Sequence, residues 1–186
     1  MNSCLRKFVR NISVLLILST VSIASAGPSK AGSNICSDPR LTYTPKSDVQ
    51  FVDFFQPHHM MAVEMADEVI ARGESAELKV MAKEMKRMQT EEIQTLRLAK
   101  KAITGKSDSP HFMDRHMMMD MKDMKTLSGK ELDIHFIDHM IAHHASALTV
   151  AHQALPYLKR TEVKDLAKMM ISTQAQEIGE LQKMRE

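Results

Sequence analysis

Mainly apolar side chains recur at steps of three and four residues along four segments of the chain. This spacing places them on one face of an α-helix. The four stripes comprise Phe51, Phe55, His58, Ala62, Met65 and Val69; Leu78, Met81, Met85, Met88, Glu92, Leu96, Ala99 and Ile103; Phe136, Met140, His143, Ala147, Val150 and Ala154; and Val163, Leu166, Met170, Thr173, Glu177, Leu181 and Met184. No segment downstream of residue 26 alternates with the period of two that a half-buried strand shows. The pattern therefore predicts an all-α protein with four helices of about 25 residues each.

Residues that begin and end helices flank these stripes. Ser47 precedes the first stripe and is a plausible N-cap, because its hydroxyl oxygen can accept a hydrogen bond from a backbone N–H of the first turn. Gly73 and Gly105 follow the first and second stripes, where glycine commonly ends a helix. Pro156 interrupts the pattern after the third stripe.

The first two stripes match the last two at one constant offset, which is the offset from His58 to His143. Fifteen of the 46 aligned pairs from Phe51 to Leu96 are identical, without a gap. The identities include both histidines of each His-His pair and a following Gln-x-x-Glu. Preserved spacing of this kind indicates that one structural unit is used twice. Each unit is predicted to be a helical hairpin.

The repeat predicts a four-helix bundle made of two duplicated hairpins, within residues 47–186. The first hairpin spans 47–104, a Met/His-rich connector spans 105–130, and the second hairpin spans 131–186. Helix connections in bundles usually have 2–8 residues, so the connector is long. A connection of this length favours a ferritin-like arrangement, in which the chain travels the length of the bundle between hairpins. The alternative is a bundle whose helices run up-down-up-down.

The first 26 residues have the features of a secretory signal peptide. Arg6, Lys7 and Arg10 are basic, a short apolar run follows, and Ala24-Ser25-Ala26 resembles a cleavage site. The alternative, a membrane anchor, would need about 20 apolar residues. Residues 27–46 would then form an N-terminal tail, and the protein would be periplasmic or extracellular, away from the membrane.

The charge and cysteine content restrict the kinds of partner and of stabilising bond. The chain has 25 basic and 23 acidic residues, and its formal net charge is +2. This balance gives no indication of a nucleic-acid or anionic-membrane partner. Cys4 lies in the predicted signal peptide, so Cys36 would be left alone and no intrachain disulfide is expected.

The duplicated histidine pairs are candidate metal ligands. His58 and His143 belong to the apolar stripes and should point inward, whereas His59 and His144 lie on the flank facing a neighbouring helix. In a hairpin that turns near residue 74, the residues at their level include two polar side chains in each unit, Gln89 and Glu92 and then Gln174 and Glu177. Buried ionisable groups need a partner or a cation. The hypothesis is a metal site in which these four side chains orient the imidazoles; the alternative is a metal-free polar network. The further candidate ligands on the same helices are Met61, Met65, His139 and Met140.

The connector is unusually rich in methionine. The candidate ligands in it are His111, Met113, His116, Met117, Met118, Met119, Met121 and Met124. Thioethers select soft ions such as Cu(I), and they need no deprotonation. The alternative is an amphipathic connector in which methionine merely fills space against the bundle. The combination with imidazoles favours copper, with Cu(I) as the most suitable oxidation state.

The repeated motif F-[VI]-D-x(4)-H-H-x(2)-A-x(3)-A, with its Gln-x(2)-Glu-Ile arm, resembles a secreted His/Met-rich family known as a domain of unknown function and typified by CopM-like copper-binding proteins. The resemblance covers residues 47–186 and implies a ferritin-like bundle and periplasmic or extracellular copper binding. The family pattern is Met-Ile-Pro-His-His followed by an Ala and then Met-Ala. This chain departs from it at three positions, where Phe55, Ala142 and Val150 replace a Met, the Pro and a Met.

These observations predict a secreted copper-binding protein that sequesters, buffers or delivers Cu(I) and has no catalytic activity. Its partner besides the metal ion would be a copper transporter or chaperone. Two alternatives remain open at this point. One is a ferritin-like oxidase acting on cuprous ion, because such bundles often host oxygen chemistry. The other is a helical adaptor that binds no metal.

Overall fold

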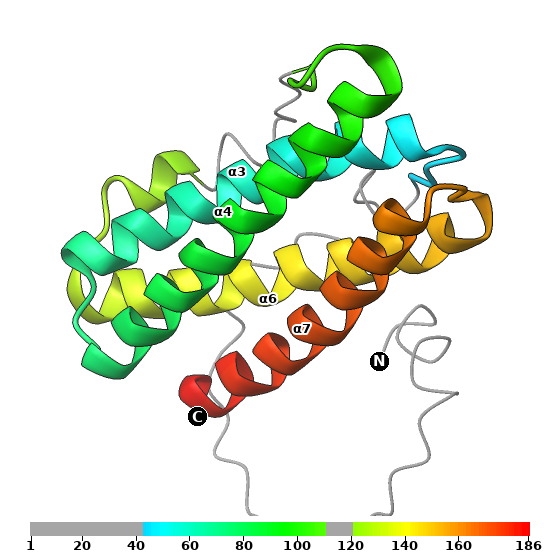
Figure 1. The fold of residues 1–186 in the computed structure, drawn as a ribbon. Helices are drawn as coiled ribbons and strands as arrows, with labels where there is room; N and C mark the ends of the chain where they lie inside the picture. The colour runs from blue at the N-terminus through cyan, green and yellow to red at the C-terminus, as the bar shows by residue number, and fades with distance from the viewer. Residues whose placement is uncertain (1–42, 111–120) are drawn as a thin grey trace, which may run out of the picture. The chain divides into compact units, whose positions relative to one another are not determined.

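The computed structural model describes residues 43–110 and 121–186. Four long helices account for most of these residues (Figure 1): α3 (Asp48–Arg72), α4 (Ala76–Thr104), α6 (Gly129–Ala154) and α7 (Thr161–Arg185), with a short 3-10 helix η3 (Leu155–Tyr157) after α6. The long helices contain 25, 29, 26 and 25 residues. Within the described residues, β-type pairing is limited to one isolated bridge between Gly73 and Gly129. The predicted all-α four-helix bundle is confirmed.

The predicted helix ends are found at the expected residues. The Ser47 hydroxyl accepts a hydrogen bond from the Gln50 N–H at 3.3 Å, as an N-cap does. Gly73 ends α3, and Gly105 ends α4 with a φ of 77°, a left-handed conformation that glycine adopts without steric cost. Pro156 lies in η3, directly after the end of α6. The helix α6 begins at Gly129, two residues before the predicted start of the second hairpin at residue 131.

The path of the chain has the ferritin-like form and excludes the up-down-up-down alternative. The start of α6 lies beside the turn between α3 and α4, because Gly129 bridges to Gly73 and the Asp133 carboxylate accepts hydrogen bonds from the Glu74 N–H. The helix α4 ends at the opposite end of the bundle (Figure 1). The two described ends of the connector therefore lie at opposite ends of the bundle, and α4 and α6 run parallel. This is why the connector is longer than a normal helix turn.

Two carboxylates link the hairpins at equivalent places in the repeat. Asp133 on α6 accepts hydrogen bonds from the N–H groups of Glu74 and Ser75, just before α4. Asp48 on α3 accepts hydrogen bonds from the N–H groups of Lys159 and Arg160, just before α7. The two accepting carboxylates are one repeat offset apart in the sequence, and so are the residues that donate to them. Each hairpin thus caps the second helix of the other, which makes the two units mutually dependent.

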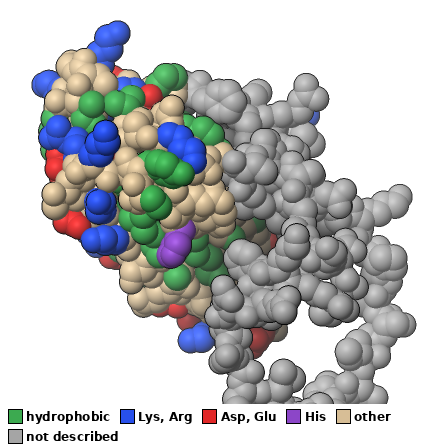
Figure 2. Space-filling model, turned by 90° about the vertical axis from the view of Figure 1, so that its right-hand side faces the viewer, with side chains coloured by type: hydrophobic (Ala, Val, Ile, Leu, Met, Phe, Trp, Pro, Cys, Tyr) green, Lys and Arg blue, Asp and Glu red, His purple; other side chains and the backbone are tan. Residues whose placement is uncertain are grey.

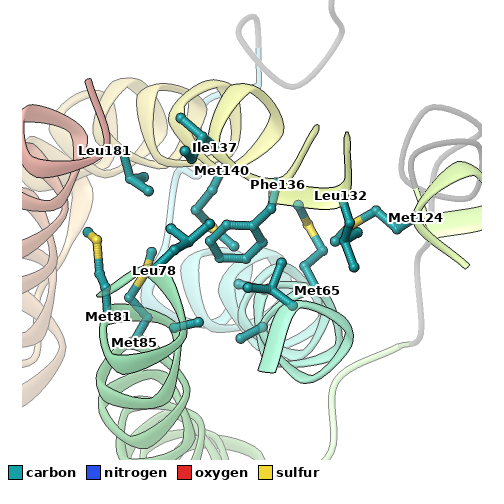
Figure 3. Close-up of a cluster of buried hydrophobic side chains, with 14 of the residues drawn as sticks. Met65, Leu78, Met81, Met85, Met124, Leu132, Phe136, Ile137, Met140 and Leu181 are labelled. Carbon is teal, nitrogen blue, oxygen red and sulfur yellow. The ribbon is translucent and has the colours of Figure 1, made fainter. Parts of the chain in front are cut away.

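The apolar core consists of two clusters separated by a layer of polar side chains. One cluster lies toward the α3–α4 turn and contains Met65, Leu78, Met85, Phe136, Met140 and Leu181, among others (Figure 3). The other lies toward the opposite end and contains Phe51, Phe55, Leu96, Val150, Val163 and Met170, among others. On all four helices, buried polar residues occupy the positions between the clusters. We call this set the polar layer: His58, His59, Gln89, Glu92, His143, His144, Gln174 and Glu177.

The surface carries side chains of mixed character. On the face shown in Figure 2, hydrophobic side chains lie among Lys and Arg side chains, and a histidine is exposed between them. Among the helices of the described residues, none is long and apolar enough to span a membrane. The predicted signal peptide and almost all of the N-terminal tail lie outside the described residues.

Candidate metal centre in the polar layer

The two inward-pointing histidines meet at the centre of the bundle. The ring centroids of His58 and His143 are 3.6 Å apart, and both residues are 2% exposed. His143 Nε2 lies 3.0 Å from the His58 carbonyl oxygen, and because a carbonyl can only accept, this Nε2 carries the proton. The Ser146 hydroxyl donates to the His143 carbonyl oxygen, so at 3.3 Å it accepts from His58 Nε2. In the neutral imidazoles the lone pair is consequently on Nδ1, the nitrogen that a proton or a metal ion would bind.

The two flanking histidines each face a glutamate of their own hairpin. His59 Nε2 lies 2.9 Å from Glu92 Oε2, and His144 Nε2 lies 2.8 Å from Glu177 Oε2. Both histidines are fully buried, and both carboxylates are nearly so. The sequence predicts a histidine and a glutamate at one level of each hairpin, and the histidine that meets the glutamate is the flanking one. The repeat has therefore placed the same pair twice.

Each flanking imidazole has a nitrogen directed away from its glutamate. The Nδ1 atoms of His59 and His144 are buried, and neither has a hydrogen-bond partner in the described structure, whereas the Nε2 atoms approach the carboxylates at ion-pair distance without hydrogen-bond geometry. A carboxylate that accepts from one ring nitrogen fixes the tautomer and makes the other nitrogen a better metal ligand. The two His–Glu pairs thus have the form of a metal-ligating imidazole with its orienting carboxylate. An imidazole nitrogen is a donor type that copper and zinc accept.

The glutamines of the polar layer are also incompletely paired. Gln89 Oε1 and both polar atoms of the Gln174 amide are buried and lack a hydrogen-bond partner in the described structure, as does Glu177 Oε1. Leaving a buried polar group unpaired costs about 1–3 kcal/mol. Such costs are unusual in a structural core, where nearly all buried polar groups are paired. Several polar atoms of the polar layer therefore have no partner among the described protein groups.

No three or more His, Cys, Asp or Glu side chains of residues 43–110 and 121–186 gather as a group that could hold a metal ion. The His58–His143 contact and the two His–Glu pairs are each two-membered arrangements. A donor set built from them would need a further ligand, such as a thioether.

The methionines proposed as ligands fall into two groups. Five of them are buried in the apolar cluster toward the α3–α4 turn: Met61, Met65, Met121, Met124 and Met140 (Figure 3 labels three of these). There they contribute apolar surface to the core, the role that methionine has as a flexible filler. The remaining candidates in the connector lie outside the described residues, namely His111, Met113, His116, Met117, Met118 and Met119.

A further pair of histidines lies on α6, one and two turns before His143. The rings of His135 and His139 are stacked with centroids 4.0 Å apart, and both side chains are partly exposed. Only His139 was a candidate ligand from the sequence, although the spacing of four residues would have identified the pair. Ser146 and the linking carboxylates Asp48 and Asp133 were also not singled out. The carboxylates could have been found, because they occupy equivalent positions in the repeat.

Comparison with known proteins supports both the fold and the resemblance. The structure of CopM in the Cu(II)-bound form is similar to this chain with a TM-score of 0.67 and 28% identity, over 75% of this chain and 95% of that chain. CopM in the Cu(I)-bound form gives a TM-score of 0.65 and 26% identity, over 74% and 94%. A DUF305 fragment from Deinococcus radiodurans gives 0.66 and 25% identity, over 76% and 96%. The search of curated proteins found no match.

The family assignment rests on the sequence of the helical region as a whole. The model of the family described as Domain of unknown function (DUF305) matches residues 48–185, from the first residue of α3 to the last residue of α7. The match therefore includes both hairpins, the connector and every residue of the polar layer. The resemblance noted in the sequence is confirmed, and the chain belongs to the DUF305 family.

Proposed function

We propose that this protein binds copper as its cargo, with preference for Cu(I), and that it sequesters, buffers or delivers the ion without a reaction of its own. CopM, whose structures with Cu(I), Cu(II) and silver are similar to this chain over three quarters of its length, supports a copper-related role. The observation in this chain that carries the proposal is the duplicated His–Glu pair with an unpartnered buried Nδ1.

In this proposal, the imidazoles of the polar layer bind the ion and the carboxylates orient them. His59 and His144 offer Nδ1, while Glu92 and Glu177 hold Nε2. His58 and His143, in contact at the bundle centre, add two more imidazoles at the same level. The thioethers of the connector would supply soft ligands outside the buried layer, since such ligands select Cu(I). Gln89 and Gln174 are buried in the same polar layer as the imidazoles.

The cellular setting is a second part of the proposal. The basic, apolar and small-residue succession at residues 1–26 supports export to the periplasm or the extracellular space. Methionine and histidine are suitable copper ligands there, because they need no reduced cysteine. A copper transporter or chaperone that donates or accepts the ion is the partner that such a role requires.

The test removes the charge of the orienting carboxylates without removing their shape. In the variant carrying Glu92→Gln and Glu177→Gln, the amide has nearly the shape of the carboxylate that it replaces, so the bundle should fold. Loss of the carboxylate should weaken Cu(I) binding about 10–100-fold, as second-shell substitutions at metal sites do. Affinity is measured by competition with a chromophoric Cu(I) chelator, and folding is monitored by helical circular dichroism.

The matched control carries Glu91→Gln and Glu131→Gln, two exposed glutamates outside the polar layer. It should bind Cu(I) as tightly as the unsubstituted protein does. If the Glu92/Glu177 variant is as helical as the control and binds Cu(I) with the same affinity, the polar layer does not hold the ion. The proposal would then fail for these residues.

A further inference from the structure

A groove separates the first half of α4 from the second half of α7. Its volume is about 870 Å³. The groove lies against the apolar cluster toward the α3–α4 turn, where Met81 and Met85 of α4 extend toward Leu181 of α7 (Figure 3). The lining side chains are Glu77, Val80, Met81, Glu84, Met85 and Met88 of α4 and Thr173, Gln176, Glu177, Glu180, Lys183 and Met184 of α7.

Four methionines, none of them part of the site proposed above, face this groove. Met81, Met85 and Met88 follow one another at steps of four and three residues, so they form one line along α4. Met184 approaches from α7. Met81 and Met85 are 9% and 2% exposed, and Met88 and Met184 are partly exposed. The thioethers thus extend from the buried wall of the groove to its mouth.

The fold itself does not require methionine at these positions. The repeat supplies the comparison, because each groove residue has an equivalent at the repeat offset in the other hairpin. The equivalents of Met81, Met85, Met88 and Met184 are Leu166, Met170, Thr173 and Ala99. Three of the four equivalents contain no sulfur; Leu166, Met170 and Ala99 pack in the apolar cluster at the other end, whereas Thr173 lines this same groove. Packing alone therefore does not explain why four thioethers gather on one side.

The charges at the groove favour a cation. Four glutamates line it, Glu77, Glu84, Glu177 and Glu180, against one lysine, Lys183. Arg87 lies on the same helix, and its guanidinium donates hydrogen bonds to Glu84 and Glu91. Clefts lined by one sign of charge raise the local concentration of the opposite ion.

The groove also adjoins one of the His–Glu pairs. Glu177 contributes to the lining, and its Oε2 lies 2.8 Å from His144 Nε2. Glu177 therefore adjoins both the groove and a buried imidazole of the polar layer. The contact gives the groove a direct connection to the candidate metal centre.

We propose that Met81, Met85, Met88 and Met184 form a thioether site for one soft monovalent cation, Cu(I) or Ag(I), in the groove beside the polar layer. Thioether ligands select such ions and bind them without releasing protons. The acidic lining concentrates the cation, and Glu177 adjoins both this site and His144. The choice of ion rests on the proposed function, whereas binding in the groove needs no histidine.

The experiment uses Ag(I) alone as the probe, because it does not oxidise. The purified protein is labelled with ¹³C at the methionine methyl groups, and single Met→Leu variants assign the four groove resonances. These four resonances should shift together as one equivalent of Ag(I) is added. The variant with all four positions changed to Leu should lose one equivalent of bound Ag(I) by elemental analysis after dialysis. Met→Leu conserves volume, so its effect on folding is small.

Met170→Leu is the matched control, because Met170 is the repeat equivalent of Met85, is equally buried and does not line the groove. It should retain the full number of Ag(I) equivalents. If Ag(I) shifts other methionine resonances but leaves the four groove resonances in place, the inference is wrong. The methyl spectra of the unsubstituted protein decide this even where the quadruple variant folds poorly.

The Glu92/Glu177 variant distinguishes failure of this inference from failure of the proposed function. If that variant binds Cu(I) normally while the groove methyl resonances respond to Ag(I), the polar layer is not the site but the groove is. If the variant loses Cu(I) affinity while the groove resonances of the unsubstituted protein remain unmoved, the reverse holds.

Discussion

The carboxylate of Asp133 is the contact whose loss should most weaken the link between the two hairpins. It is 6% exposed, and it accepts the Glu74 N–H at 3.1 Å through each oxygen and the Ser75 N–H at 2.7 Å. These N–H groups belong to the turn that begins α4, where the helix has no internal acceptor for them. Asp133→Ala leaves both groups without their acceptor in a poorly hydrated position.

The loss of unfolding free energy follows from the hydrogen bonds that the substitution removes. A hydrogen bond to a charged group contributes about 1.5–3 kcal/mol, and two N–H groups are affected, so the expected loss of unfolding free energy is about 3 kcal/mol. The repeat offers a matched comparison in Asp48→Ala, which removes bonds to Lys159 and Arg160 at 3.0 and 3.4 Å. Asp48 is only partly buried, so water can replace it, and its loss should cost about 1 kcal/mol.

Urea unfolding monitored by circular dichroism measures both variants. The midpoint of the Asp133→Ala variant should fall about three times as far as that of Asp48→Ala, with an unchanged slope. Its melting temperature should fall by roughly 6–12 °C. Asp133→Asn, which keeps an acceptor and removes only the charge, should lose about 1 kcal/mol. Equal losses of under 1 kcal/mol in the two alanine variants would refute the assignment of a linking role to the buried carboxylate.

Three further substitutions test the same end of the bundle. A Cβ at Gly73 would lie 2.4 Å from Asp133 Oδ1, so Gly73→Ala should cost about 1–3 kcal/mol in urea unfolding; Gly179→Ala, in open space on α7, should instead stabilise by about 0.5–1 kcal/mol. The Arg72 guanidinium donates to three carbonyl groups in the last part of the connector, those of Met124, Lys125 and Leu127. Arg72→Met should therefore speed tryptic cleavage after Lys125 by about tenfold, and an unchanged rate would contradict this anchoring.

The helices and their ends could be predicted from the sequence because they depend on local rules. The steps of three and four residues, Ser47 as N-cap and glycines 73 and 105 as stops are properties of short segments. The repeat was visible because a constant, gapless offset preserves the spacing of its residues. The burial of the histidine pairs followed from the same periodicity.

The partners of the histidines could be predicted only in part. The level of Glu92 relative to the histidines followed from counting residues about the turn, but whether His58 or His59 meets it depends on the rotation of α4 about its axis. The stacking of His58 on His143 depends on how the hairpins pack together. Neither the rotation of α4 nor the packing of the two hairpins is encoded in a single helix.

By itself, the sequence determined the helices, their duplication and the set of polar side chains at mid-bundle, because periodicity and caps act within one segment. The tertiary structure alone decided which of these side chains meet. Packing α6 against α3 joins His58 to His143, and the splay of α4 from α7 opens the methionine groove. Residues far apart in sequence come together only when long loops close. The gain that offsets the entropy of closure comes from the whole packed core rather than from any local pattern.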